Sequence, residues 1–421
     1  MGARLVWAIV PLVCVMNVSH PKLILLTVCL VALMSTAGVA MPYPILAPIF
    51  VNSAPDAFNH FLGLPPKLLL GLALAANPLG ILLGSTLIGA LSDRLGRRRV
   101  LTGTLLLTFA GYLLTAYALW SRWYLLFVLA RFVTGLTEGN VAVARAIVAD
   151  LHPQLDRTRS FAILNAVLYT GWLVGPLIGG LTLPLGEAVP FLLAASAILL
   201  CLAVLLVFLP ETGERMHQDQ TLLQVMRGQH SFRLLSADPL LARLFWMQLA
   251  FAIGVNAFYE FYPLWLVEYA RLDSRGIAVV TALMCVLMTS ASVLLGKLGH
   301  KRAPLELARI NAAWVALGLL GLSLLADLPW PGIGLIVLLG VPLAIYNAIL
   351  PSWCSERFAS LGQGSVMGLL TTIFCVANVL VALLGSVLTI LDTRLVLVLG
   401  ALTCGLAAVW LQGVIREAED V

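Results

Sequence analysis

The chain has 421 residues, of which 61% are hydrophobic and only 11% are Asp, Glu, Lys or Arg. An average soluble domain carries about 25% charged residues, so this composition excludes a water-soluble globular protein. The formal net charge of +5 would suit an anionic partner such as nucleic acid if the basic residues formed one soluble patch.

Long charge-poor stretches alternate with short polar connections and predict transmembrane helices. A bilayer core about 30 Å thick needs about 20 helical residues to cross it. The runs are continuously apolar, which excludes a β-barrel, whose strands alternate apolar and polar residues. The sequence therefore predicts an all-α integral membrane protein of about twelve helices. The expected spans are residues 23–50, 68–91, 100–119, 124–148, 160–182, 188–209, 241–266, 277–297, 307–326, 332–353, 364–390 and 395–414.

Residues 5–16, ahead of the first span, are also apolar and follow Arg4. They are too short to cross a bilayer, and no small-residue cleavage site follows them directly. We expect an interfacial segment, or a start codon annotated too far upstream, instead of a signal peptide. Whether residues 1–17 belong to the mature chain stays open.

The longest polar segment, residues 210–239, divides the spans six and six. We therefore expect an N-terminal six-helix bundle at residues 1–209, a linker at 210–239 and a C-terminal six-helix bundle at 240–421.

Basic residues gather on one side of the predicted membrane. Eighteen of the 25 Lys and Arg residues fall in the amino terminus, the linker, alternate loops and the carboxyl terminus. Basic loops are retained in the cytoplasm, so both termini and the linker are expected there, in a bacterial inner membrane. This distribution explains the net charge without nucleic acid. The side with few basic residues carries Lys67, Arg122, Arg271, Arg275 and Arg394.

The loop between the second and third spans carries a specific motif, GALSDRLGRRR, at residues 89–99. A basic cytoplasmic loop explains the arginines, but not Gly89, Gly96 or the Asp93 carboxylate at the membrane edge. The string is similar to the signature loop of the major facilitator superfamily and matches it at every defined position. The resemblance implies the major facilitator fold, with two six-helix bundles around a central cavity.

In that family the loop holds the two halves together on the cytoplasmic side. The resemblance assigns this latch to Gly89, Asp93, Arg94, Gly96 and Arg97, together with Asp150 at the end of the fourth span. A carboxylate is stabilised near a helix amino terminus, so we expect Asp93 to meet the start of the eleventh span near residues 362–364. We expect Arg97 to pair with Asp150.

The fifth span carries glycines at every fourth position, Gly171, Gly175 and Gly179, which leave a smooth stripe for close helix packing. Pro176 removes a backbone donor within the span. Generic small-residue packing is one explanation of the stripe. With Gly180, the full string is similar to the signature of the antiporter branch of the superfamily, where it is thought to control sealing of the substrate cavity.

The fourth span carries Arg131, Glu138 and Arg145, seven residues apart. On an ideal helix this spacing drifts by only about 20° per step, so the three charges should share a face. Arg131 and Gly135 look like a family motif that is linked with proton coupling. Charges at this depth are costly unless they face a cavity or a partner. A purely structural ion pair is the alternative.

The seventh span carries Glu260 among aromatic residues, with Asn256 and Tyr259 close by. One hypothesis makes Glu260 a carboxylate of the central cavity. The alternative is a carboxylate near an aromatic belt at the outer surface. Further residues are candidates for the cavity lining, although ordinary packing explains any one of them equally well: Tyr43, Asn165, Tyr169, Tyr346, Asn347 and Asn378.

Only Glu138 and Glu260 lie well inside predicted spans among the 20 Asp and Glu residues. Two arginines on the face of Glu138 favour its ionised form, whereas Glu260 has no cation nearby on its own helix face. We therefore expect Glu260 to be the principal proton carrier and Glu138 to be a coupling or gating partner of Arg131.

Motifs of other protein classes are missing from the sequence. It has no P-loop, GxSxG or HExxH string, its seven cysteines have no CxxC spacing, and no histidine falls inside a long apolar run. We expect no enzyme activity, metal or cofactor.

The expected function is proton-coupled export of a small drug-like or amphipathic compound, by alternating access in a monomer. One alternative is a proton-coupled transporter of a specific metabolite, because fold alone does not decide the substrate. A non-transporting membrane receptor or scaffold is another. For that class we would expect a large soluble domain or a loss of intramembrane charges.

Overall fold

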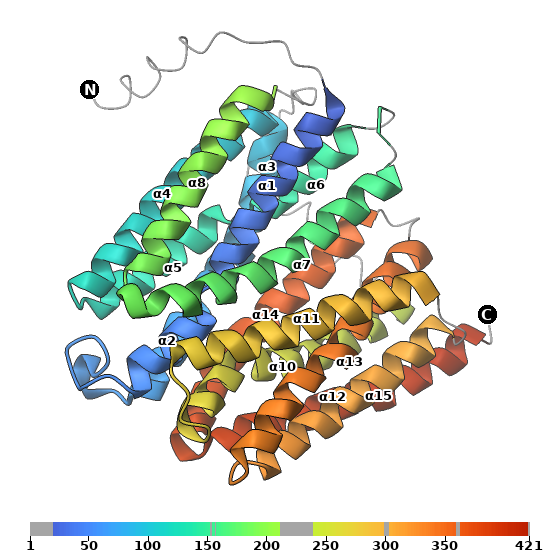
Figure 1. The fold of residues 1–421 in the computed structure, drawn as a ribbon. Coiled ribbons are helices and arrows are strands. Elements are labelled where there is room, and N and C mark those ends of the chain that lie inside the picture. Colours follow the sequence, from blue (N-terminus) through green and yellow to red (C-terminus); the bar gives the residue numbers. More distant parts are fainter. Residues whose placement is uncertain are drawn as a thin grey trace.

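The computed structural model describes residues 20–210, 239–298, 303–358 and 363–419, apart from residues 152, 153 and 156. The predicted segment 5–16 and nearly all of the predicted linker, 210–239, lie outside these ranges. Within them, twelve helical segments are long and apolar enough to cross a membrane. This number confirms the prediction. Figure 1 shows how the helices form two groups along the chain.

The first six spans form the N-terminal bundle. The first and fourth spans are each built from two helices, which meet at Met41–Pro42 and at Glu138–Gly139. Short 3-10 turns, η3 (Phe61–Gly63) and η4 (Leu183–Leu185), occur in two of the loops. The helices of this bundle are α1 (Pro21–Ala40), α2 (Tyr43–Val51), α3 (Pro66–Leu95), α4 (Arg97–Trp120), α5 (Tyr124–Thr137), α6 (Asn140–Asp150), α7 (Arg157–Thr182) and α8 (Val189–Phe208).

The last six spans form the C-terminal bundle, each as one continuous helix. Proline opens many helices in both bundles, because a first-turn residue lacks an intrahelical partner for its N–H in any case. The helices of this bundle are α10 (Pro239–Glu268), α11 (Ser274–Leu298), α12 (Pro304–Leu324), α13 (Pro329–Arg357), α14 (Gln363–Leu391) and α15 (Thr393–Glu419).

The two bundles meet where α3 packs against α14, α7 against α11, and α2 against both α10 and α11. Figure 1 shows α7 lying against α11 at this boundary. We call the end that carries the start of α1 and the end of α15 the terminal end. Since successive spans alternate in direction, α3, α11 and α15 begin at the opposite end, where α2, α10 and α14 finish.

The glycine stripe of α7 packs against α1. A Cβ atom added at Gly171 would lie 2.7 Å from Thr36 Cβ, and one at Gly175 would collide with the carbonyl oxygen of Ala37. A side chain therefore does not fit at either position, and these glycines permit a close approach of the two helix backbones. The stripe therefore lies in a helix interface and does not face lipid.

Gly180 packs in another direction, across the boundary between the bundles. A Cβ atom there would lie 2.6 Å from Ala278 Cβ and 3.0 Å from the Ser274 carbonyl oxygen, both in α11. The predicted antiporter motif thus contacts both the neighbouring helix of its own bundle and the facing helix of the other.

Candidate functional site

Glu138 lies at the break in the fourth span and is buried, with 3% of its surface exposed. Both carboxylate oxygens accept hydrogen bonds from neighbouring helices. Tyr112 of α4 donates to Oε1, and Asn77 of α3 donates to Oε2 at 2.7 Å. Gly38 of α1 leaves room for this arrangement, since a Cβ atom there would collide with the Tyr112 hydroxyl. The carboxylate is therefore held by hydrogen bonds from two neighbouring helices.

Arg131 is buried beside this carboxylate, with 2% of its surface exposed. It is close enough to act electrostatically on both Tyr112 and Glu138. Its Nη1 atom has no hydrogen-bond partner among the described residues. The predicted association of Arg131 with Glu138 is therefore present, and Tyr112 belongs to the same group.

Arg145 is separated from this group by the helix break, which corrects the expectation of three charges on one ideal helix face. The helix α5 ends at Thr137 and α6 begins at Asn140. The Arg145 Nη1 atom donates to Thr371 Oγ1 of α14 at 3.4 Å. Arg145 thus reaches across the boundary between the bundles.

Glu260 lies within α10, eight residues or about 12 Å before its end. Its surface is 2% exposed, and neither carboxyl oxygen has a hydrogen-bond partner among the described residues. Trp265 is also buried. Both side chains are therefore covered by protein, and their depth relative to the outer membrane interface stays a prediction.

Three of the predicted cavity residues meet in one hydrogen-bond chain across the two bundles. The Asn378 amide of α14 donates to the Tyr43 hydroxyl of α2 at 2.9 Å and to Asn256 Oδ1 of α10 at 3.1 Å. All three side chains are buried. This chain lies one helical turn from Glu260, because Asn256 precedes it by four residues on α10.

Aromatic rings from four helices surround this junction. The Trp172 ring of α7 lies 6.0 Å from Tyr43, 6.4 Å from Tyr259 and 5.5 Å from Phe374 of α14, measured between ring centroids. Trp172 and Phe374 were not among the residues expected here. The position of Trp172 inside the glycine motif was a usable signal, but nothing in the sequence near Phe374 distinguishes it from packing residues.

The predicted cavity residue Tyr346 of the tenth span makes its contacts within the C-terminal bundle and not at this junction. Tyr346 stacks on Phe251 within the C-terminal bundle, with 3.5 Å between ring centroids, and donates to Gln248 Oε1 at 2.8 Å. Asn347 is half-buried on α13. Asn165 and Tyr169 belong to α7, but their side chains lie outside the described part of the chain.

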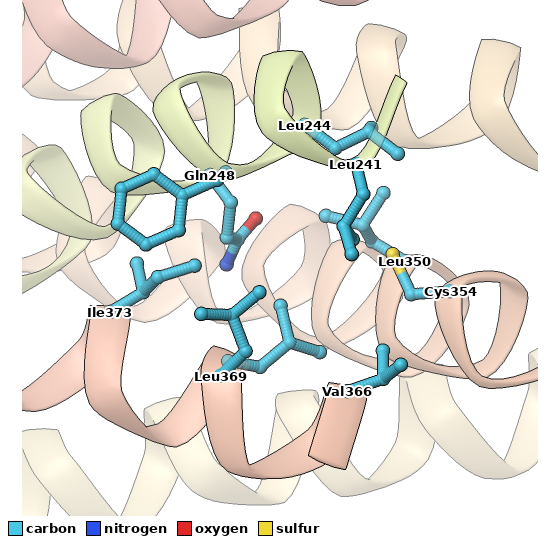
Figure 2. Close-up of a pocket in the computed structure, with 10 residues that line it drawn as sticks. Leu241, Leu244, Gln248, Leu350, Cys354, Val366, Leu369 and Ile373 are labelled. Atoms are coloured by element: carbon cyan, nitrogen blue, oxygen red, sulfur yellow. The ribbon is translucent and has the colours of Figure 1, made fainter. Parts of the chain in front are cut away.

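Gln248 lines a small, largely apolar cavity between α10, α13 and α14 (Figure 2), which the sequence did not indicate. Figure 2 shows its amide among Leu241, Leu369 and Ile373.

The signature loop contains the ion pair that the sequence predicts. Arg97 Nε lies 3.3 Å from Asp150 Oδ2, and Arg97 also donates to Ser92 Oγ at 2.7 Å. Gly96 joins α3 to α4 with a φ of +98°, in the region that favours glycine. Gly89 and Arg94 lie in the last two turns of α3. The side chain of Asp93 and residue 362 lie outside the described atoms, so their expected contact stays a prediction.

A twelve-helix membrane bundle with buried charges in both halves defines a transporter. The chain belongs to the Major Facilitator Superfamily, whose sequence profile matches residues 23–382. The resemblance of the signature loop to this family is thereby confirmed.

Two relatives are bacterial resistance proteins. The class E tetracycline resistance protein of Escherichia coli is 29% identical over 360 residues, 80% of each chain. The class H protein of Pasteurella multocida is 28% identical over 194 residues, and this match spans only 45% of its length. The crystal structure of the human organic anion transporter MFSD10 has a TM-score of 0.69, with 21% identity over 93% of this chain and 99% of that chain. This structural likeness confirms the fold.

Proposed function

We propose that this transporter is a proton-coupled exporter of small drug-like or amphipathic compounds. The observation that carries the proposal is Glu260, a buried carboxyl group of α10 with no hydrogen-bond donor among the described residues. A buried carboxylate is costly without donors or a counter-ion. Such a group is suited to bind a proton in one state and to release it in another.

Glu138 has a different environment, which supports a different role. Both of its carboxyl oxygens accept hydrogen bonds, from Asn77 and Tyr112, and Arg131 lies close by, whereas neither oxygen of Glu260 has a partner among the described residues. We assign Glu260 as the proton carrier and Glu138 as the partner that holds Arg131 in place.

Four aromatic rings and the two resistance-protein relatives support the proposed substrate class. Four aromatic rings, from Tyr43, Trp172, Tyr259 and Phe374, offer flat apolar surfaces at the boundary between the bundles. Export is favoured by the two relatives that are named as tetracycline resistance proteins.

Proton-coupled transport of a specific anionic metabolite is the second candidate. The observation in its favour is the buried Arg131, whose Nη1 atom has no partner among the described residues. The similarity to a structure described as an organic anion transporter points the same way. A scaffold is the weaker alternative, because it would retain costly buried charges without a use for them.

For orientation, we propose that both termini are cytoplasmic in a bacterial inner membrane. Arg97, Arg98 and Arg99 lie at the terminal end, and basic loops are retained in the cytoplasm. The proposed latch, with Arg97 and Asp150, then closes the cytoplasmic side. The proposed units are residues 1–209, 210–239 and 240–421, in a monomer.

A transport assay tests the function. The purified protein is reconstituted into liposomes that contain a pH-sensitive dye, and tetracycline is added as the probe, with an organic anion dye as the comparison. Export coupled to protons predicts a proton flux opposite to tetracycline movement. Proton flux with the anion alone would select the second candidate, and no flux with any gradient would favour the scaffold.

A further inference from the structure

The hydroxyl group of Tyr43 lies where the charged regions of the two bundles approach each other. Arg131 of α5 and Glu260 of α10 both act electrostatically on this hydroxyl. Tyr43 is buried in the first turn of α2, directly after the break in the first span. A change of charge on Glu260 therefore acts on a residue of the other bundle.

The hydrogen bonds at this junction leave a proton of Tyr43 to be donated. Asn378 uses both N–H groups of its amide, one toward Tyr43 and one toward Asn256. The Tyr43 oxygen is the acceptor in its bond. A phenol is a donor as well as an acceptor, so the Tyr43 O–H group can turn to a second partner.

This O–H group has two candidate partners. One is a small cavity, lined by Tyr43, Asn77 and Arg131 and with room for about one water molecule. The other is Glu260, which acts electrostatically on Tyr43 and has no donor among the described residues.

We propose that Tyr43 is the positioning residue that couples the protonation of Glu260 to the approach of the two bundles, an inference that rests on the proton-coupled transport proposed above. While Glu260 holds its proton, the Tyr43 O–H group donates into the cavity that it shares with Arg131. When the proton leaves, the carboxylate requires a donor in its dry environment. The Tyr43 O–H group then turns to Glu260 and draws α2 toward α10.

Among the described residues, the Tyr259 phenol of α10 also belongs to this junction, with its ring 6.4 Å from that of Trp172. Beside Arg131 and Glu260, Cys375 of α14 acts on Tyr43. Two groups on the remaining helices that pack against α10 are engaged elsewhere. Cys404 of α15 donates to the carbonyl oxygen of Phe251, and Tyr346 of α13 donates to Gln248, more than two turns before Glu260. From α12, Arg309 pairs with Glu306 of its own helix.

Infrared titration of the carboxyl band tests the inference without a substrate. The protein is reconstituted into liposomes, and the band of Glu260 is assigned by its absence in Glu260→Gln. Tyr43→Phe keeps the ring beside Trp172 and removes the hydroxyl. We expect the pH midpoint of the Glu260 band to rise by about one to two units, because the carboxylate loses a charge-assisted hydrogen bond.

Two further variants test the direction of the midpoint shift and provide a control. Asn378→Ala should move the midpoint in the opposite direction, because it releases Tyr43 toward Glu260. Tyr262→Phe is the matched control, since Tyr262 is also on α10 but bonds Thr281 within its own bundle at 2.7 Å. Its midpoint should equal that of the unmodified protein.

The outcomes separate the two proposals. An unchanged midpoint in both Tyr43→Phe and Asn378→Ala, with the band still assigned to Glu260, would overturn the role of Tyr43 alone. If no titrating carboxyl band is lost in Glu260→Gln, the proton site itself is overturned. If Tyr43→Phe does not reach the membrane, the Asn378→Ala shift decides the question.

Discussion

Lys67 and Glu268 join the two bundles at the end opposite the chain termini, with 2.6 Å between Nζ and Oε1. Lys67 opens α3 of the N-terminal bundle, and Glu268 closes α10 of the C-terminal bundle. Lys67 also donates to the Thr389 carbonyl oxygen at 2.7 Å, and Thr393 donates to Glu268 at 2.5 Å. Alternating access requires the bundles to separate at this end, so the bonds from Lys67 to Glu268 and to Thr389, which join the two bundles, must break during the cycle.

Lys67→Met should therefore favour the state that is open at this end. A partly exposed ion pair contributes about 1 kcal/mol, which corresponds to about a fivefold change in population. Ser386→Cys reports opening, because Ser386 is buried against Gly71 of α3 near this end. We expect a membrane-impermeant maleimide to label Ser386→Cys several-fold faster in the Lys67→Met background.

The control for this experiment is Glu187→Gln. Glu187 accepts two hydrogen bonds from Arg122 at 2.5 and 3.0 Å, also at this end but within one bundle. The maleimide should label Ser386→Cys at the same rate with and without Glu187→Gln. If Lys67→Met leaves the labelling rate of Ser386→Cys unchanged, the Lys67–Glu268 pair does not hold the bundles together.

Glu260→Gln should separate exchange from energised export. A permanently neutral side chain mimics the protonated carboxyl group, so exchange of tetracycline should survive while accumulation driven by a proton gradient fails. Both rates are measured in the same liposomes. Full gradient-driven export in Glu260→Gln, together with its loss in Glu138→Gln, would reverse the two assigned roles.

Gly175→Leu should prevent the close packing of α7 against α1. The added side chain collides with the Ala37 backbone, and overpacking of this kind costs about 1–3 kcal/mol. We expect a lower melting temperature in detergent and a loss of transport. Gly103→Leu on α4 is the control, because a Cβ atom there meets nothing within 4 Å. Normal transport by Gly175→Leu would contradict the role of the stripe.

Asp93→Asn should reduce transport without preventing membrane insertion. The substitution removes the charge that we expect to interact with the start of α14 and with nearby arginines. Asp150→Asn, which removes the partner of Arg97, should have a smaller effect because the pair is partly exposed and contributes about 0.2–1 kcal/mol. Transport rates normalised to the amount of protein in the membrane compare the two. Unchanged transport in Asp93→Asn would contradict the latch.

The number and order of the spans follow from the sequence alone. Continuous apolar runs leave the backbone no alternative to helix within a bilayer, and the spacing of Gly171, Gly175 and Gly179 indicated a packing stripe. The rarity of carboxylates within these runs also singled out Glu138 and Glu260, both of which are buried.

The contacts between spans were decided only by the tertiary structure. The break at Glu138 separates Arg145 from its predicted neighbours, and Tyr346 packs within one bundle. Neither Tyr112 nor Phe374 was distinguished from other aromatic residues. The physical reason is that lipid is as apolar as the protein interior, so hydropathy does not reveal which face of a membrane helix meets another helix. Helix rotation and tilt are set by side-chain packing against neighbouring helices, and these bring Tyr43 within electrostatic reach of both Arg131 and Glu260.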